Sequence, residues 1–146
     1  MPRNLVRDWM TPDPVTIGPK TTVPEAHKLM KEHDFRRLPV VNDHGRLIGI
    51  VTLSDLREAG PSPATSLSIF ELNYLLAQLT IDKIMTRDVV TVSPDATIRD
   101  AANLMLKHEV GALPVMEDDK LIGIITESDI FRVIVQQPET ATSPES

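Results

Sequence analysis

The segment Gly49-Ile50-Val51-Thr52-Leu53-Ser54-Asp55 returns in the second half of the chain as Gly123-Ile124-Ile125-Thr126-Glu127-Ser128-Asp129. In each copy an apolar run typical of a buried strand leads into Thr-x-x-Asp. A threonine followed by an acid three positions later is a helix-capping signature, so both copies predict a strand that runs directly into a helix. The start of such a helix also carries free backbone N–H groups and the positive end of the helix dipole, which suit a phosphate.

The two segments belong to a longer internal repeat. At an offset of 75 residues, Met10-Thr11 matches Met85-Thr86, and Leu38-Pro39-Val40 matches Leu113-Pro114-Val115. The offset then falls to 74, because the turn that follows this strand is one residue shorter in the second copy. Polar surface turns tolerate such insertions, so we interpret the chain as a tandem duplication.

Each repeat predicts the element order β-α-β-β-α. Short strands are expected at residues 15–17 and 89–92, and the next helices begin at the capping boxes that Thr22 and Thr97 open. Apolar residues spaced three and four apart give each of these helices one buried face. A third capping box at Ser68 predicts a connecting helix between the repeats.

Composition excludes several classes of function. The 146 residues include no cysteine, which rules out disulfides, thiolate catalysis and cysteine-based zinc sites. The net charge of −6 argues against a protein that binds nucleic acid by neutralising phosphates. No apolar run reaches membrane-spanning length and no signal peptide is visible, so we expect a soluble cytoplasmic protein. No catalytic constellation stands out, and His33 and His108 fit the ends of helices better than a metal site.

The duplicated unit resembles a CBS domain (cystathionine-β-synthase domain), and two units in tandem resemble a Bateman module. The residues that carry the resemblance are Met-Thr near the start of the repeat, the Leu-Pro-Val strand and Gly-Ile-Val-Thr-x-Ser-Asp. The resemblance implies an α+β fold in which two β-α-β-β-α repeats pack about a pseudo-twofold axis and leave two clefts. We expect repeat 1 at residues 5–58, a linker loop and connecting helix at 59–79, repeat 2 at 80–135 and a disordered tail at 136–146.

The same resemblance implies an adenosine-containing ligand in one or both clefts. Asp55 and Asp129 would accept the ribose hydroxyls, Thr52 and Thr126 would meet phosphate, and the first strand of each repeat would line the adenine slot. The expected nucleotide-binding residues are Thr16, Ile17, Phe35, Arg36, Arg37, Pro39, Thr52, Ser54 and Asp55 in the first copy, and Thr91, Val92, Val110, Gly111, Ala112, Pro114, Thr126, Ser128 and Asp129 in the second.

The two copies differ before the Leu-Pro-Val strand. Arg36-Arg37 could bind phosphates, or could be a solvated charge pair that covers a sheet edge, whereas Gly111 and Ala112 carry no charge. If both clefts bind, we expect the one near the arginines to prefer polyphosphates.

We therefore expect a stand-alone regulatory module, not an enzyme, that senses AMP, ADP or ATP with or without magnesium and requires no other cofactor. The resemblance further implies a homodimer and a separate effector protein regulated in trans. The lack of a membrane-spanning apolar run predicts no membrane partner, and the acidic net charge argues against nucleic acid. Two alternatives remain open. One is a structural dimerisation module with no ligand, since Thr52–Asp55 and Thr126–Asp129 are sound helix caps in any case. The other is a nucleic-acid or magnesium-linked regulator.

Overall fold

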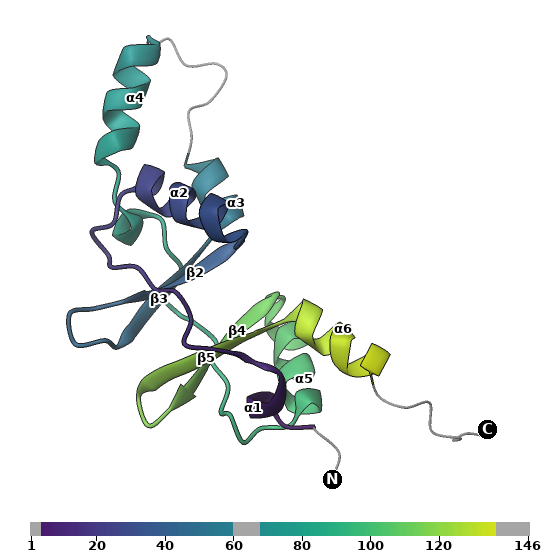
Figure 1. The fold of residues 1–146 in the computed structure, drawn as a ribbon. Coiled ribbons are helices and arrows are strands. Elements are labelled where there is room, and N and C mark those ends of the chain that lie inside the picture. Colours follow the sequence, from purple (N-terminus) through teal and green to yellow (C-terminus); the bar gives the residue numbers. More distant parts are fainter. Residues whose placement is uncertain (1–3, 60–67, 137–146) are drawn as a thin grey trace. The chain divides into compact units, whose positions relative to one another are not determined.

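The computed structural model describes residues 4–59 and 68–136. The chain divides into two compact units, of which unit 2 runs from Pro14 to Val89 and unit 1 combines the residues before Pro14 with those after Val89. The elements, labelled in Figure 1, are in chain order α1 (Val6–Trp9), β1 (Thr11–Pro12), α2 (Val23–His33), β2 (Arg37–Val41), β3 (Leu47–Thr52), α3 (Leu53–Glu58), α4 (Ile69–Gln78), the 3-10 helix η1 (Ile81–Lys83), α5 (Ile98–His108), β4 (Ala112–Glu117), β5 (Lys120–Thr126) and α6 (Glu127–Gln136).

Unit 2 is built on the antiparallel pair β2–β3, in which Arg37 lies opposite Thr52 and Leu38 opposite Val51. Helices α2 and α3 pack together beside this pair. Pleated strands bury alternate side chains, and the helices add one apolar face each. The resulting core contains Ile17, Val23, Ala26, Met30, Leu38, Val40, Val51, Leu56, Ile81 and Met85.

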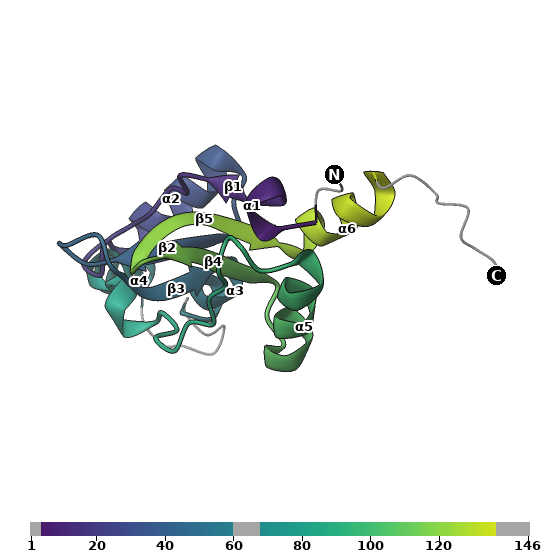
Figure 2. The ribbon, with the colours of Figure 1, turned by 90° about the horizontal axis from the view of Figure 1, so that it is seen from below.

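Unit 1 repeats this plan with one more regular strand. Its sheet has the order β1-β5-β4, with Thr11 opposite Ile124 and Ala112 opposite Thr126. Figure 2 shows β1 and α1 beside the strands and helices of this unit. The core contains Val6, Val92, Ile98, Ala101, Met105, Leu113, Val115, Ile125 and Val133.

Each unit joins the body of one repeat to the opening segment of the other. Met10-Thr11, which opens the first repeat, crosses Gly123 in β5, while Met85-Thr86 of the second repeat crosses Gly49 in β3. A Cβ on Gly123 would lie 2.5 Å from the Met10 sulfur and 2.9 Å from the Thr11 carbonyl oxygen, and a Cβ on Gly49 would be as close to Met85. The glycines are therefore required for this close approach.

An ion pair joins each opening segment to the repeat against which it packs, and the positions of its positive and negative residues are reversed between the two units. In unit 1, Arg7 of the opening segment pairs with Asp95, while in unit 2 the corresponding residues are Asp82 and Lys20, 3.0 Å apart. If each opening segment lay on its own repeat, Arg7 would face Lys20 and Asp82 would face Asp95 in the aligned positions. Like charges repel, so this pattern favours the observed exchange over the alternative.

The structure confirms the α+β class and the helix starts that the sequence predicted. Thr22, Thr52, Ser68 and Thr97 each cap a helix, and each accepts a hydrogen bond from the backbone N–H three residues later. Each capping side chain thus satisfies a helix N–H that has no partner within the helix.

The strands expected at residues 15–17 and 89–92 are wrong in extent. Each is reduced to a single parallel bridge, from Ile17 to Val40 and from Val92 to Val115. Prolines at positions 14 and 19, and at 94, cannot donate a ladder hydrogen bond, which limits the pairing. The expected loop after residue 59 and the expected disordered tail fall largely on residues 60–67 and 137–146, outside the described residues.

Candidate functional site

The first candidate site lies where β3 runs into α3. The Thr52 N–H donates to Oδ2 of Asp55 at 2.8 Å, and the Asp55 N–H donates to the Thr52 hydroxyl at 3.1 Å. Among the described residues, no donor lies within hydrogen-bond distance of the other carboxylate oxygen of Asp55. Asp55 is half-buried. A partly accessible carboxylate with one oxygen free can accept hydrogen bonds from a ligand.

The segment before β2 is held directly against this helix start. The Leu53 N–H donates to the Arg36 carbonyl oxygen at 2.7 Å, and Arg37 lies opposite Thr52 in the sheet. The Arg36 side chain is exposed. The structure therefore brings together three groups that the sequence predicted to share a site: the arginine pair, Thr52 and Asp55.

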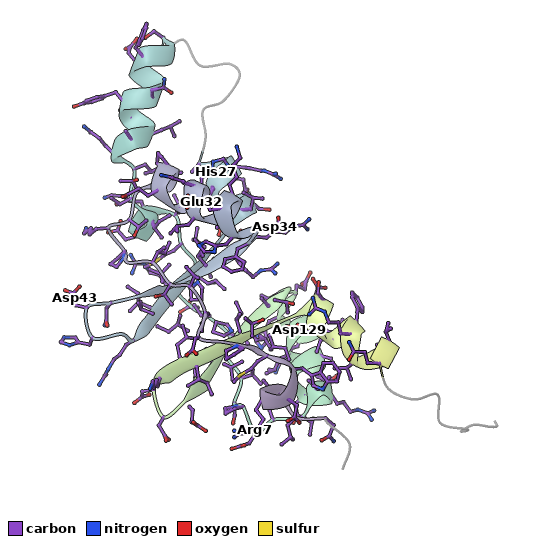
Figure 3. The ribbon with its side chains drawn as sticks, viewed as in Figure 1. Arg7, His27, Glu32, Asp34, Asp43 and Asp129 are labelled. Atoms are coloured by element: carbon purple, nitrogen blue, oxygen red, sulfur yellow. The ribbon has the colours of Figure 1, made fainter. Side chains whose placement is uncertain are left out.

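Unit 1 repeats this arrangement with different side chains. The Glu127 N–H donates to the Gly111 carbonyl oxygen at 3.0 Å, and Ala112 lies opposite Thr126. Asp129 is 4% exposed and lies in the first turn of α6 (Figure 3). Its Oδ2 accepts hydrogen bonds from the Thr126 N–H at 2.9 Å and from the Thr126 hydroxyl at 3.2 Å.

The other oxygen of Asp129 is occupied by a residue that the sequence reasoning missed. Arg132, one turn along α6, forms an ion pair with Oδ1 of Asp129. The spacing of three residues between an acid and a base on one helix was the available signal. At the matching position unit 2 has Glu58, so Asp55 has no such cation. Both carboxylate oxygens of Asp129 are thus engaged, whereas no residue in the described ranges donates to Oδ1 of Asp55.

The residues expected to line an adenine slot lie beside the Leu-Pro-Val strands. The Ile17 N–H donates to the Pro39 carbonyl oxygen at 3.1 Å, and the Val92 N–H donates to that of Pro114 at 3.0 Å. The side chains of all four residues are buried, so they pack in the interiors of the two units. The neighbouring Thr16 is half-buried and Thr91 is exposed, and these threonines remain able to meet a ligand.

The remaining candidates differ in their surroundings. Ser54 and Ser128 are exposed on the first turns of α3 and α6. Phe35 stacks on His33 with ring centroids 5.2 Å apart, while its counterpart is Val110. Within the described part of the chain, no group of three or more histidine, aspartate or glutamate side chains could hold a metal ion.

The same capping box also forms at helix starts outside the two candidate sites. At α2 the N–H and hydroxyl of Thr22 both donate to Glu25 at 2.9 Å, and these hydrogen bonds lower the pKa of that carboxyl. At α5 the Thr97 N–H donates to Asp100 at 3.1 Å and the Asp100 N–H donates back to the Thr97 hydroxyl at 3.0 Å. The caps at Thr52 and Thr126 therefore need no ligand to explain them.

Comparison with known proteins agrees with the repeat. A family model described as the CBS domain matches residues 6–62 and 81–136. A CBS domain-containing protein of Dictyostelium discoideum is 34% identical over 133 residues, covering 90% of this chain and 92% of that protein. L-aspartate semialdehyde sulfurtransferase of Methanocaldococcus jannaschii is 33% identical over 135 residues, covering 90% of this chain and 23% of the enzyme. The chain thus spans about a quarter of the length of this enzyme.

Two solved structures share the fold over nearly the whole chain. The CBS domain pair of protein MJ0100, in complex with 5′-methylthioadenosine and S-adenosyl-L-methionine, has a TM-score of 0.76 and 32% identity, covering 92% of this chain and 98% of that one. CBSX2 in complex with AMP has a TM-score of 0.74 and 31% identity, with the same coverage. In the described residues, no helix has the length and apolarity to cross a membrane.

Proposed function

Because the chain belongs to the CBS-domain family and carries two of its domains in tandem, we propose that it is a regulatory module that binds an adenosine-containing ligand. Support comes from the two similar domain pairs that were solved with AMP or with S-adenosyl-L-methionine and 5′-methylthioadenosine. These ligands share an adenine and a ribose. The proposed role is binding and regulation, with no reaction catalysed by this pair.

The free oxygen of Asp55 is the observation that carries the proposal. Its Oδ2 accepts a hydrogen bond from the Thr52 N–H, and Oδ1, at a half-buried position, accepts none from residues 4–59 and 68–136. A single carboxylate can accept hydrogen bonds from two neighbouring ribose hydroxyls. Hydrogen bonds to a charged group contribute about 1.5–3 kcal/mol each, so this contact would favour a ribonucleoside over its deoxy counterpart.

The arginine pair adds a preference for phosphate. The Arg36 side chain is exposed, and its carbonyl oxygen accepts a hydrogen bond from the N–H of Leu53, the first residue of α3. This contact holds Arg36 close to Thr52 and Asp55, which lie in the same helix start. Guanidinium groups bind phosphate with paired hydrogen bonds. We therefore assign AMP, ADP or ATP, with or without magnesium, to the unit 2 site.

The unit 1 site differs in what a ribose must displace. At Asp129 the ribose hydroxyls would compete with Arg132 for Oδ1, and unhindered access to this oxygen requires that Arg132 move away. This exchange costs the ion pair, so the proposed affinity of unit 1 for the same ligand is lower than that of unit 2. Once released, Arg132 could meet a phosphate.

Regulation then follows from differential binding. A ligand shifts a conformational equilibrium only by the difference between its affinities for the two conformations. The proposed readout is a change in the conformations that a partner protein recognises.

A structural module without a ligand is the second candidate. The capping boxes at Thr22, Ser68 and Thr97 favour it, since the same hydrogen bonds form there at helix starts outside the two candidate sites. The two candidates make different predictions for Asp55, because a residue that only caps a helix has no effect on ligand binding.

Thermal unfolding of the chain with a ligand panel tests the proposal. The panel is AMP, ADP, ATP, NAD and S-adenosyl-L-methionine, each with and without magnesium. A ligand at 100 times its dissociation constant adds about 2.7 kcal/mol of stability. For a chain of this size we expect a rise in unfolding temperature of about 5–10 °C.

Matched variants separate capping from binding. Asp55→Ala and Asp100→Ala each remove the acid of one capping box, and each should cost about 0.5–2 kcal/mol of stability. We expect the ligand-induced rise to disappear in Asp55→Ala and to persist in Asp100→Ala. If no ligand raises the unfolding temperature at millimolar concentration, the structural candidate replaces the proposed function.

A further inference from the structure

The ion pair between Asp129 and Arg132 has no counterpart in unit 2, although the surrounding backbone arrangement is shared. In both units the acid lies three residues after a threonine and accepts the N–H of that threonine through Oδ2. Three residues beyond the acid, unit 1 has Arg132 and unit 2 has Glu58, whose side chain is exposed. Because α3 forms without an arginine at this position, the pair is not a requirement of the fold.

Asp129 is the buried member of the pair. Its side chain is 6% exposed, whereas that of Arg132 is 58% exposed. Oδ1 of Asp129 accepts from the guanidinium, while Oδ2 accepts from the N–H and the hydroxyl of Thr126. A buried carboxylate oxygen without a hydrogen-bond partner is unfavourable, so Oδ1 is expected to exchange one donor for another. Ribose hydroxyls are donors that can replace the guanidinium.

This exchange has a different consequence for the arginine. Asp129 would gain hydrogen bonds from the ribose, but Arg132 would lose its anion. Within the residues that the structure describes, Arg132 forms an ion pair with Asp129 alone. The freed guanidinium must therefore turn to solvent or pair with an anion that the ligand carries. Guanidinium groups form paired hydrogen bonds with phosphate, so a phosphate on the same ribose compensates for the lost ion pair, whereas adenosine offers no such group.

On the basis of the proposed function, we propose that Arg132 competes with the ribose for Asp129, so that unit 1 discriminates against adenosine and in favour of its phosphorylated forms. Unit 2 has Glu58 at the matching position and binds the ribose without this competition. Arg132 thereby sets the specificity of one site and leaves the other unaffected.

The size of the effect follows from the population of the ion pair. When only a fraction of the molecules has a free binding group, the apparent dissociation constant is the intrinsic one divided by that fraction. A pair formed in about two thirds of the molecules weakens ribose binding about threefold, and one formed in about nine tenths weakens it about tenfold. Removing Arg132 should therefore strengthen adenosine binding at unit 1, although it removes a residue from the site.

A site-resolved NMR titration of the full chain measures this effect. The amides of Thr52 and Thr126 donate to the two carboxylates, so their resonances report binding at unit 2 and at unit 1 separately. In Arg132→Ala the dissociation constant of adenosine at Thr126 should fall at least threefold. The ratio of the adenosine constant to the AMP constant at Thr126 should also fall at least threefold. The constants at Thr52 should be unchanged and are the internal control.

The first repeat supplies the reciprocal variant, which keeps the proposal testable if Arg132→Ala does not fold. Glu58→Arg places a cation three residues after Asp55, the spacing that pairs Arg132 with Asp129. It should weaken adenosine binding at Thr52 at least threefold and AMP binding less. Glu58→Ala is the matched control and should leave adenosine binding unchanged.

The possible outcomes separate this inference from the proposed function. An arginine that only binds phosphate would leave adenosine binding at Thr126 unchanged in Arg132→Ala, and one that only supports the helix would weaken adenosine and AMP alike. Either result overturns the inference, as does binding at Thr52 with none at Thr126 in both the wild type and Arg132→Ala. The last three results leave the proposed function of unit 2 intact. If neither amide responds to either ligand in any of these chains, the proposed function fails and this inference with it.

Discussion

Replacing Gly123 by alanine tests the exchange of opening segments between the repeats. The added Cβ would lie 2.5 Å from the Met10 sulfur, which is at the flexible end of a side chain and can move. It would also lie 2.9 Å from the Thr11 carbonyl oxygen, which belongs to the backbone of β1 and is held by pairing with β5. Such a contact must open by several tenths of an ångström, so β1 must move away from Gly123.

The expected cost follows from overpacking of a close contact. Overpacked positions lose about 1–3 kcal/mol, and the lower entropy of the unfolded alanine chain returns about 0.4–1 kcal/mol. We therefore expect a net loss of about 1–2 kcal/mol, measured by urea unfolding at 25 °C. Gly18→Ala is the matched control, since no atom lies within 4 Å of its added Cβ, and its stability should be unchanged or slightly raised.

Hydrogen exchange locates the damage. The Asp13 N–H donates to the Ile122 carbonyl oxygen at 3.1 Å, next to the crossing at Gly123. In Gly123→Ala this amide should exchange faster, while the amides between β4 and β5 keep their protection. The reasoning is refuted if Gly123→Ala and Gly18→Ala have the same stability, or if the protection of Asp13 is unaltered.

Three further predictions concern charge. Arg7→Asp should lower the urea midpoint, because the new carboxylate would face Asp95. Adding Asp95→Lys should restore most of the lost stability, since unit 2 has an acid and a lysine at the same two positions. A double variant as unstable as the single variant would contradict the pairing. The hydrogen bonds from Thr22 lower the pKa of Glu25, so this carboxylate stabilises the fold above about pH 4.5 and loses its effect as the pH falls through its folded pKa. The urea midpoint of Glu25→Gln should therefore lie below that of the wild type at pH 7, and the difference should shrink as the pH is lowered below 4.5. Arg36→Ala should weaken ATP binding at least tenfold while changing adenosine binding less, as measured by calorimetric titration; equal losses for both would exclude a phosphate contact.

The local parts of the fold could be predicted from sequence because they depend on residues close together in the chain. Each capping box needs only a Ser or Thr and an acid three positions later, and those at Thr22, Thr52, Ser68 and Thr97 cap helices at the expected residues. The strand that leads into Thr52 also forms as predicted.

The exchange of opening segments was not predicted, because Met10-Thr11 and Met85-Thr86 are the same dipeptide and Gly49 and Gly123 the same partner. Nothing in these motifs says which segment crosses which glycine. The opposite charges of Arg7 and Asp82 distinguish the two possible arrangements. They could be interpreted only once the structure showed their partners, Asp95 and Lys20.

The difference between the two sites was only half predicted from sequence. The arginine pair at the start of β2 marked unit 2 as the more cationic site, but Arg132 supplies a cation to unit 1 and pairs it with the carboxylate of Asp129. That contact depends on the side-chain conformation of one helical turn, which sequence spacing allows but does not determine.

Adenosine-ligand binding at Asp55 is tested most directly by calorimetric titration with AMP and with 2′-deoxy-AMP. The wild type should bind AMP at least tenfold more tightly than the deoxy analogue, because the carboxylate loses one charge-assisted hydrogen bond. Asp55→Ala should bind AMP more weakly and no longer distinguish the two ligands, while Asp100→Ala should behave as the wild type. If Asp55→Ala binds AMP as the wild type does, or retains the full preference over the deoxy analogue, Asp55 does not hold the ribose and the assignment of the site is wrong.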